Sequence, residues 1–500
     1  MEKESFINKN NKVILWIFIA ITIVHVLYAA FSVRVAYMDG TPQLLHILNN
    51  IANGTTKLYI DPGHPRFFVS ALMQLPSFLV AKMLILSSKF SISVFYSFCW
   101  FAISPLLVYF NYKLSNRTKN YDTFIASLFF YSMVILLYQI FVVVESSVAI
   151  LTILLLYNYI RSKIDYTTKD LVIIALLTIM LFASHELVLF CVPILLVSSL
   201  LFAKDEENTK NKITKISVGI ASLFAFFYIY FFMFKIKGNG GEISRFLNEF
   251  FGSLGTSFDT SFSITIVGLI LIGLVIAIFK SKKELTIKHI SIATVIIFYN
   301  LYIMFRQLDL YVNPIIEGHY RVIDIFLFPI ILFFIAVKDI AKKEISPVIL
   351  NNTITIIAIV GIAQTIWQID NTYWWNKNIE YMQDKLQKCE TSLYIPDPKE
   401  PPISKFFEND KRNYIWHADY TAISILFAKD YEVKTILGIY DKLYEENNAT
   451  ERQLLFSNDN NLFMPYITVD IKNKFWDLTE PAKALDLYNT THNIKTNKQN

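Results

Sequence analysis

Charged residues are scarce in this chain, and their scarcity excludes a soluble globular protein. Only 17% of the 500 residues are Asp, Glu, Lys or Arg, whereas 54% are hydrophobic, and the mean hydropathy is +0.42. Such a composition lacks the polar surface that a soluble domain needs. The apolar residues form long runs and not short alternating segments, which is typical of membrane helices and not of a barrel. The sequence therefore predicts an α-helical polytopic membrane protein.

Cysteine is also scarce, with three residues in the whole chain. Cys99 and Cys191 lie inside apolar runs, and Cys389 stands alone in the polar C-terminal region. This arrangement offers neither an intramolecular disulfide framework nor a zinc-binding pattern. The first apolar run, 13–33, has no small-residue cleavage site of a signal peptide, so we expect it to remain as a membrane anchor.

Basic residues gather in clusters that alternate with turns poor in Lys and Arg. The clusters are Lys3/Lys9/Lys12, Lys113/Arg117/Lys119, Arg161/Lys163/Lys169, Lys204/Lys210/Lys212/Lys215, Lys280/Lys282/Lys283/Lys288 and Lys338/Lys342/Lys343. The positive-inside rule places all of them in the cytoplasm, together with the N-terminus. Membrane orientation thus explains the modest net charge of +5, and we expect no nucleic acid as a partner.

About eleven transmembrane helices follow from this pattern. The predicted spans are 13–33, 90–112, 122–143, 147–161, 170–185, 187–203, 216–234, 262–280, 290–306, 322–338 and 348–368. The apolar segment 67–87 is interpreted as an interfacial or half-buried helix on the outer side, because counting it as a span reverses every later basic cluster. A true span with inverted topology after it remains the alternative.

The composition divides the chain into two predicted domains. Residues 1–369 form the transmembrane domain, whose first outer loop covers 34–89, whereas residues 370–500 are polar and rich in Asn and Lys. An odd number of spans after a cytoplasmic N-terminus places the second domain outside the cytoplasmic membrane. Short segments such as 421–427 and 433–439 predict a small α/β domain there.

The first outer loop contains an acid, a short helix and a His-Pro turn. Asp39 directly follows the first span, and apolar residues then recur at helical spacing from Leu44 to Ile51. That spacing predicts an amphipathic helix lying flat at the membrane surface. Asn53-Gly54 ends the helix, and His64-Pro65 lies in a tight turn before the next apolar run.

In this order, Asp39, the surface helix, Gly54 and His64-Pro65 resemble the first outer loop of GT-C glycosyltransferases. The most similar branch contains protein O-mannosyltransferases and aminoarabinose transferases, which move a sugar from a polyprenyl-phosphate carrier on the outer face of a membrane. The resemblance implies a GT-C-like fold, membrane lipid as surroundings and a polyprenyl-phosphate-linked sugar as donor.

The chain departs from the typical pattern of that branch, which is an Asp-Glu pair and a His-Pro-Pro-Leu turn. Here Asp39 is followed by Gly40, and the turn reads His64-Pro65-Arg66-Phe67. Some GT-C enzymes hold a divalent metal with outer-loop acids, but the missing second acid gives no reason to expect one. We expect no cofactor.

The resemblance assigns Asp39 as the general base that takes the proton of the acceptor hydroxyl. In the alternative interpretation, Asp39 caps the helix that starts near Thr41. The donor's phosphate calls for cations on the outer face, and the candidates are Arg66, Arg306, His319 and Arg321. A guanidinium grips phosphate with two hydrogen bonds. Alternatively, Arg321 pairs with a neighbouring acid such as Asp309 or Asp324.

The predicted substrate pocket is completed by polar residues of the outward turns and loops. These are His64, Glu145, His185, Glu186 and Tyr320. Acids at such positions are costly and need a reason, although Glu145 and Glu186 fit equally well as plain span-end residues.

The predicted function is inverting transfer of a hexose or pentose from a polyprenyl-phosphate carrier to a hydroxyl of a glycan, lipid or protein, as a step of envelope glycan biosynthesis. Two alternatives remain. One is a transporter or flippase of lipid-linked saccharides, which also needs outer acids and arginines. The other is a non-catalytic envelope-assembly factor that keeps the fold without the second acid.

Overall fold

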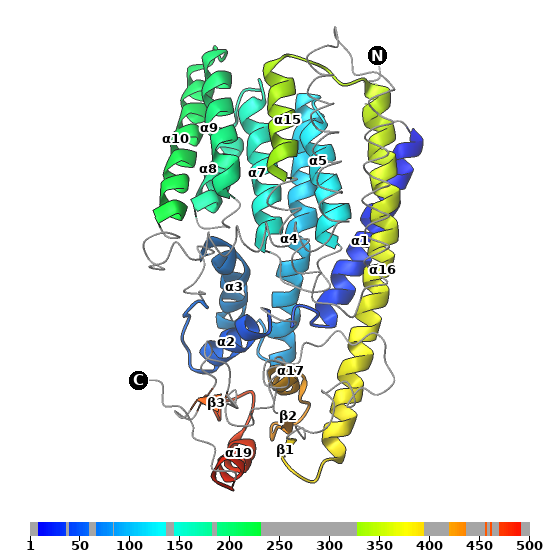
Figure 1. Cartoon of the computed structure of the whole chain (residues 1–500), viewed down its shortest axis with the longest axis vertical. Helices are drawn as coiled ribbons and strands as arrows, with labels where there is room; N and C mark the ends of the chain where they lie inside the picture. The colour runs from blue at the N-terminus through cyan, green and yellow to red at the C-terminus, as the bar shows by residue number, and fades with distance from the viewer. Residues whose placement is uncertain are drawn as a thin grey trace, which may run out of the picture.

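The computed structural model describes residues 9–36, 40–59, 67–83, 85–136, 145–182, 188–231, 328–394, 420–436, 456–457, 461–462 and 470–491. The helices are α1 (Lys9–Phe31), α2 (Gly40–Ala52), α3 (Phe67–Lys82), α4 (Lys89–Thr118), α5 (Asp122–Phe130), the π-helical turn η1 (Tyr131–Ile135), α7 (Glu145–Arg161), α8 (Thr168–Phe182), α9 (Val188–Lys204), α10 (Thr209–Phe231), α15 (Phe328–Ile340), α16 (Pro347–Lys388), α17 (Tyr420–Phe427) and α19 (Thr479–Thr491). Figure 1 shows most of them as one bundle, with α17, α19 and short strands at its lower end.

The described helices identify the chain as an α-helical membrane protein. Four of them are long and apolar enough to cross a bilayer: Asn11–Phe31, Lys89–Thr118, Thr209–Ile229 and Pro347–Lys388. Large apolar side chains such as Trp16, Phe224 and Val348 are more than half exposed, as expected where a helix faces lipid and not water. The predicted spans 262–280 and 290–306 lie outside the described residues.

α1 and α16 run parallel through the bundle. Near their starts, Asn11 Nδ2 donates to the carbonyl of Asn351 at 3.2 Å, and near the end of α1, Trp375 Nε1 donates to the carbonyl of Ser32 at 3.0 Å. Between these points Gly361 allows close approach, because a Cβ there would lie 2.6 Å from the ring of Phe18. The two helices therefore share a packed seam over most of the length of α1.

α4 runs in the opposite direction, so it begins at the end where α1 finishes. Ser97 Oγ donates to the carbonyl of Ala29 at 3.3 Å, and Arg117, near the other end of α4, pairs with Asp170 at 2.8 Å. The connection through α2 and α3 therefore starts and finishes at the same end of the bundle. This favours the interpretation of segment 67–87 as a helix that does not cross.

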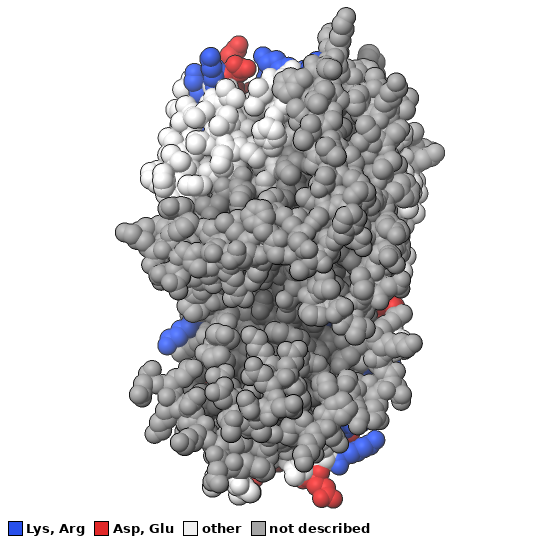
Figure 2. Space-filling model, in the orientation of Figure 1, with Lys and Arg blue, Asp and Glu red and all other residues white. Residues whose placement is uncertain are grey.

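Several basic clusters meet at one end of the bundle, which we call the basic end. Lys215 Nζ pairs with Glu206 at 2.5 Å, and Asn208 Nδ2 donates to Asp165 Oδ1 at 2.8 Å. Lys342 lies 3.7 Å from Asp205, which joins the ends of α15 and α9. Figure 2 shows charged side chains at this end, the upper one in the view. The loop between α7 and α8, the loop between α9 and α10 and the end of α15 therefore lie at the same end of the bundle.

The C-terminal elements lie at the other end, which we call the far end (Figure 1). α16 continues unbroken through residue 369 to Lys388, a length of about 63 Å. Just beyond it, strand β1 (Leu393–Tyr394) pairs in parallel with β2 (Thr435–Ile436). β3 (Phe456–Ser457) and β4 (Asn461–Leu462) form an antiparallel pair. α16 thus connects the bundle directly to the C-terminal elements.

Candidate functional site

Most of the site residues that the sequence singles out lie outside the described residues. These are Asp39, His64, Arg66, His185, Glu186, Arg306, His319, Tyr320 and Arg321. Glu145 is the first residue of α7, and its side chain is also outside the described set. The structure describes the residues on either side of Asp39. Ala36 and Gly40, which flank 37–39, are both buried.

α2 forms where the sequence predicts the amphipathic helix. Leu44, Leu45, Ile47 and Leu48 on its apolar face are fully buried. The helix ends at Ala52, and the chain then turns at Gly54, whose φ of +70° lies in the left-handed region that favours glycine. The local pattern alone was therefore enough to place this helix and its end.

The polar side of α2 is covered by protein. Gln43, Asn49 and Asn50, all on the polar side, are at most 8% exposed. Tyr96 Oη of α4 donates to Gln43 Oε1 at 2.6 Å. Asn49 Oδ1 accepts hydrogen bonds from the backbone N–H of Asp470 and from Asn473 Nδ2, both at 3.2 Å. Protein groups far away in sequence thus replace the water that the amphipathic pattern implies.

His46 contributes no charge to this environment. Its Nε2 donates to the carbonyl of Lys57 at 3.0 Å, and its ring meets the ring of Tyr59 edge-on at 5.7 Å. Burial lowers the pKa of His46, although the hydrogen bond to Lys57 opposes that shift. The imidazole is therefore neutral at neutral pH, with the proton on Nε2.

A buried arginine lies in the turn that follows α1. The backbone N–H of Arg34 donates to the carbonyl of Ala29 at 2.9 Å, and Ser97 Oγ of α4 donates to the same carbonyl. The Arg34 residue is only 3% exposed, and its guanidinium carbon lies 4.7 Å from the centroid of the Trp375 ring. A desolvated cation over an indole face is a strong cation–π arrangement. Arg34 is therefore held at the meeting point of α1, α4 and α16.

Trp375 is held from several sides. It is completely buried, and its N–H donates to the carbonyl of Ser32 at 3.0 Å. The neighbouring Asn376 Nδ2 donates to Ser32 Oγ at 2.8 Å. On the other side, the ring of Phe427 from α17 lies 6.0 Å away and edge-on. The indole is thus a fixed support for Arg34, built from α1, α16 and α17.

Two buried hydrogen-bond donors lie on α2 and α4. The Thr41 hydroxyl, in the first turn of α2, and the Trp100 indole N–H have no hydrogen-bond partner among the described residues. The Trp100 ring contacts the ring of Tyr96, whose hydroxyl donates to Gln43 of α2. We call Arg34 and Trp375, with the side chains of Asn376 and Phe427 that support them, the Arg34 junction.

The sequence analysis did not single out Arg34, although a signal was present. Arg34 is a cation directly after the first predicted span, on the side where the positive-inside rule disfavours one. A cation in that position is unfavourable, as an acid within a span is, and it is therefore a candidate for a functional role.

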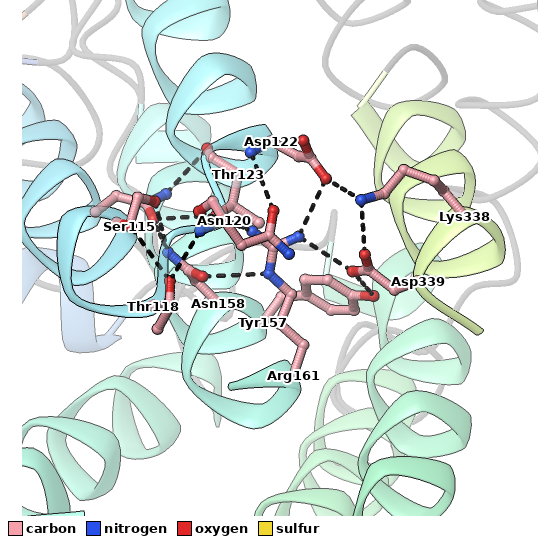
Figure 3. Close-up of polar contacts among 11 residues, drawn as sticks. Ser115, Thr118, Asn120, Asp122, Thr123, Tyr157, Asn158, Arg161, Lys338 and Asp339 are labelled. Carbon is pink, nitrogen blue, oxygen red and sulfur yellow. Dashed lines mark hydrogen bonds and ion pairs between the residues drawn. The ribbon is translucent and has the colours of Figure 1, made fainter. Parts of the chain in front are cut away.

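A second group of charges lies at the basic end and is shown in Figure 3. Arg161 of α7 pairs with Asp339 of α15 at 3.1 Å and with Asp122 of α5 at 3.6 Å. Lys338 pairs with the same two acids, with Asp339 at 2.9 Å and with Asp122. The four side chains, all at least nine-tenths buried, form a closed ring of alternating charge, which we call the charge ring.

Further polar contacts surround the charge ring. Tyr157 Oη donates to Asp339 Oδ2 at 3.1 Å, and Arg161 Nε donates to Asn158 Oδ1 at 3.2 Å. Asn158 Nδ2 continues the network to Asn111 Oδ1 of α4 at 2.6 Å. Because each cation of the charge ring contacts both of its carboxylates, the ring presents neither a free base nor a free cation to a substrate. The charge ring therefore ties α4, α5, α7 and α15 together and is poorly suited to bind a substrate.

The described residues contain no group of three or more His, Cys, Asp or Glu side chains arranged to hold a metal ion. Comparison of the chain with family models, with curated proteins and with solved structures finds no match.

Proposed function

We propose that the protein is an inverting, GT-C-like glycosyltransferase of the cytoplasmic membrane, which transfers a hexose or pentose from a polyprenyl-phosphate carrier to an acceptor hydroxyl. The observation that carries the proposal is helix α2, which forms in the first outer loop between Asp39 and Gly54, in the order that resembles GT-C glycosyltransferases. Arg34, a buried cation over Trp375, comes shortly before Asp39 in the sequence. A phosphate leaving group needs a cation, because negative charge develops on its oxygen as the sugar departs.

In the proposed reaction Asp39 accepts the proton of the acceptor hydroxyl, and the hydroxyl oxygen attacks the anomeric carbon. The bond between that carbon and the phosphate oxygen breaks, and its electron pair leaves with the phosphate, so the anomeric configuration inverts. Arg34 stabilises the departing phosphate. Arg66, Arg306, His319 and Arg321 are further candidates for this role.

The remaining assignments complete the proposal. His64, Glu145, His185, Glu186 and Tyr320 line the sugar and acceptor pocket. The chain crosses the membrane about eleven times with a cytoplasmic N-terminus, and residues 370–500 form an extracytoplasmic domain. Support comes from the basic clusters, which share one end of the bundle, and from the C-terminal elements, which lie at the other. The donor is a polyprenyl-phosphate sugar, and the acceptor is a glycan, lipid or protein.

The test is sugar transfer by the purified full-length protein in nanodiscs, with polyprenyl-phosphate sugars as donors. Asp39→Asn keeps the size of the side chain but cannot take a proton, so turnover should fall by about two orders of magnitude or more while donor binding persists. Asp39→Glu should keep part of the activity. Asp384→Asn is the matched control, because Asp384 is an exposed acid of α16, and it should behave as wild type.

Two outcomes would replace the proposal. Movement of a lipid-linked saccharide across the bilayer without any transfer product identifies a transporter. Absence of transfer, combined with cells in which Asp39→Asn supports a normal envelope, identifies an assembly factor.

A further inference from the structure

The exposed face of α16 changes its chemistry along the helix. Between residues 353 and 369 its exposed side chains are all apolar, and they are Ile359, Ala363 and Ile366. From residue 373 onward the exposed side chains are aromatic, charged or amide, namely Tyr373, Lys377, Glu380, Tyr381, Asp384, Gln387 and Lys388. Lipid tails accept the first set of side chains and water accepts the second. The face therefore passes from a lipid-facing to a water-facing character within a few turns.

Two aromatic side chains occupy the place of this change. Tyr373 is exposed, and its ring meets the ring of Trp374 edge-on, with 5.6 Å between the centroids. Lys377 Nζ lies 5.8 Å from the centroid of the Tyr373 ring and pairs with Glu380 at 2.7 Å. Tyrosine and tryptophan are enriched at the headgroup level of membranes, because their rings are apolar and their polar atoms can reach water.

The lipid-facing surface of α1 ends at the same level. Phe31 is the last residue of α1 and its last exposed apolar side chain. The next residue, Ser32, accepts hydrogen bonds from Trp375 Nε1 at its carbonyl and from Asn376 Nδ2 at its hydroxyl. Phe31 and Tyr373 are thus near one another along the bundle axis, and α16 continues beyond this level while α1 does not (Figure 1). The Arg34 junction lies at this level too.

The lengths of the two apolar faces match the thickness of a bilayer. The exposed apolar side chains of α1 extend from Val13 to Phe31, which is about 27 Å along the helix. On α16 the distance from Val348 to Asp370 is about 33 Å. The hydrocarbon core of a bilayer is about 30 Å thick. The remaining residues of α16 are therefore not needed to cross the membrane.

The part of α16 beyond this level, Lys377–Lys388, is about 17 Å long, and we call it the α16 extension. The C-terminal elements are attached to it. Gln383 Nε2 donates to the carbonyl of Phe427 in α17, and Lys434 Nζ, directly before β2, donates to the carbonyl of Cys389 at 2.5 Å. The extension thus connects the lipid-facing part of α16 with the C-terminal elements.

We propose that the headgroup layer at the far end of the bundle meets α16 between Asp370 and Lys377, with Tyr373 and Lys377 in contact with phospholipid headgroups. The phosphate and ester oxygens of these lipids accept hydrogen bonds from the tyrosine hydroxyl and the lysine ammonium. The α16 extension stands beyond the headgroups and holds the C-terminal elements there. This inference does not use the proposed activity, because it follows from the lipid-facing side chains alone.

The chain contains a matched control for this contact. Tyr381 and Lys385 repeat the arrangement of Tyr373 and Lys377, since Lys385 Nζ lies 5.0 Å from the centroid of the exposed Tyr381 ring. The second pair is about 12 Å farther along the helix. The two pairs have the same chemistry, and the inference assigns headgroups to the first and water to the second.

The experiment uses the full-length protein in liposomes of phosphatidylcholine and phosphatidylglycerol. Nitroxide labels are attached to single cysteines introduced at five positions of the exposed face, in a background with Cys99→Ser and Cys389→Ser. Cys191 is fully buried, and the background protein must remain unlabelled. Electron paramagnetic resonance compares collisions of each label with oxygen, which concentrates in hydrocarbon, and with a water-soluble nickel chelate. The labelled positions are Ile359, Ile366, Tyr373, Tyr381 and Asp384.

Labels at Ile359 and Ile366 should collide mainly with oxygen, and labels at Tyr381 and Asp384 mainly with nickel. The crossover should fall at Tyr373, and the depths of the labels at Tyr373 and Tyr381 should differ by about 12 Å.

A pair of double variants tests the headgroup contact itself. Tyr373→Leu/Lys377→Leu extends the apolar face and should move the crossover by about one turn, or about 5 Å, toward Asp384. Tyr381→Leu/Lys385→Leu should leave the crossover where it is. The crossover is interpolated from the labels that each variant retains.

A crossover before Ile366, a crossover at or beyond Tyr381, or equal nickel collisions at all positions overturns the inference. An unmoved crossover in Tyr373→Leu/Lys377→Leu shows that these side chains do not contact the headgroups, and an equal shift in both double variants shows that the assigned level is wrong. None of these outcomes changes the proposed function, because sugar transfer is not measured.

Discussion

Buried charged side chains have different surroundings at the two ends of the bundle. At the basic end, Arg161 and Lys338 each contact the same two carboxylates, those of Asp122 and Asp339. At the far end, Arg34 is equally buried and lies over the indole of Trp375. The contacts of the charge ring are ion pairs, whereas the contact described for the Arg34 guanidinium is with an aromatic ring.

The difference separates a structural role from a binding role. A balanced, hydrogen-bonded ring specifies how helices pack, because removing one member leaves an uncompensated charge in a region of low dielectric. In the proposed function, the cation over the aromatic ring meets the donor's phosphate, which a guanidinium can grip with two hydrogen bonds. The comparison predicts that changes at the basic end reduce stability, whereas changes at the far end reduce ligand binding.

The largest expected effect is the loss of the charge ring. Arg161→Met leaves Asp122 and Asp339 with Lys338 as their one remaining cation in the ring, and should lower the free energy of unfolding by about 3–5 kcal/mol. Thermal unfolding in detergent measures it. The double variant Arg161→Met/Asp339→Leu should recover part of the loss, because it restores the charge balance. Equal stability of the single variant and wild type contradicts the structural role of the charge ring.

The next effect concerns the far end. Arg34→Gln removes the cation but keeps hydrogen-bonding capacity, and it should weaken undecaprenyl phosphate binding by about 1.5–3 kcal/mol, the usual range for hydrogen bonds to charged groups. Arg34→Lys should recover only part, since Lys lacks the planar fork. Binding isotherms at constant ionic strength measure both variants. If Arg34→Gln lowers the unfolding temperature and leaves binding unchanged, Arg34 has a structural role, as the charge ring does.

A smaller effect is expected where the C-terminal region meets α2. Asn49→Ala leaves the N–H groups of Asp470 and Asn473 without their acceptor, which should cost about 1–3 kcal/mol of unfolding free energy. Asn53→Ala is the matched control, because Asn53 contacts the same Asp470 from an exposed position and should change stability by less. Chemical denaturation compares them. Equal losses in the two variants would show that the burial of Asn49 is irrelevant.

The smallest effect belongs to an exposed ion pair at the basic end. Lys342 and Asp205, with side chains 80% and 56% exposed, lie 3.7 Å apart. Lys342→Met should change the free energy of unfolding by no more than about 1 kcal/mol, because water screens such pairs. The same thermal assay as for Arg161→Met provides the contrast. A loss comparable to that of Arg161→Met would mean that burial is not what makes the charge ring important.

Much of the fold follows from local sequence pattern. The apolar run 90–112 corresponds to α4, 147–161 to α7 and 187–203 to α9, with ends that differ by a few residues. The helix predicted between Asp39 and Gly54 is also present as α2. The predicted site could be followed less far, because all its side chains lie outside the described residues.

The sequence by itself determined where many of the described helices lie, because hydrophobic periodicity and turn residues act over a few positions of the chain. Only the tertiary structure decided which charged groups meet their partners. Asp122 pairs with Lys338, and Lys89 donates to a carbonyl at the end of α17. The tertiary structure likewise covered the polar side of α2 and seated Arg34 on Trp375. These partners are hundreds of residues apart, and no local pattern encodes them. Their choice depends on desolvation, which exists only once the helices have packed.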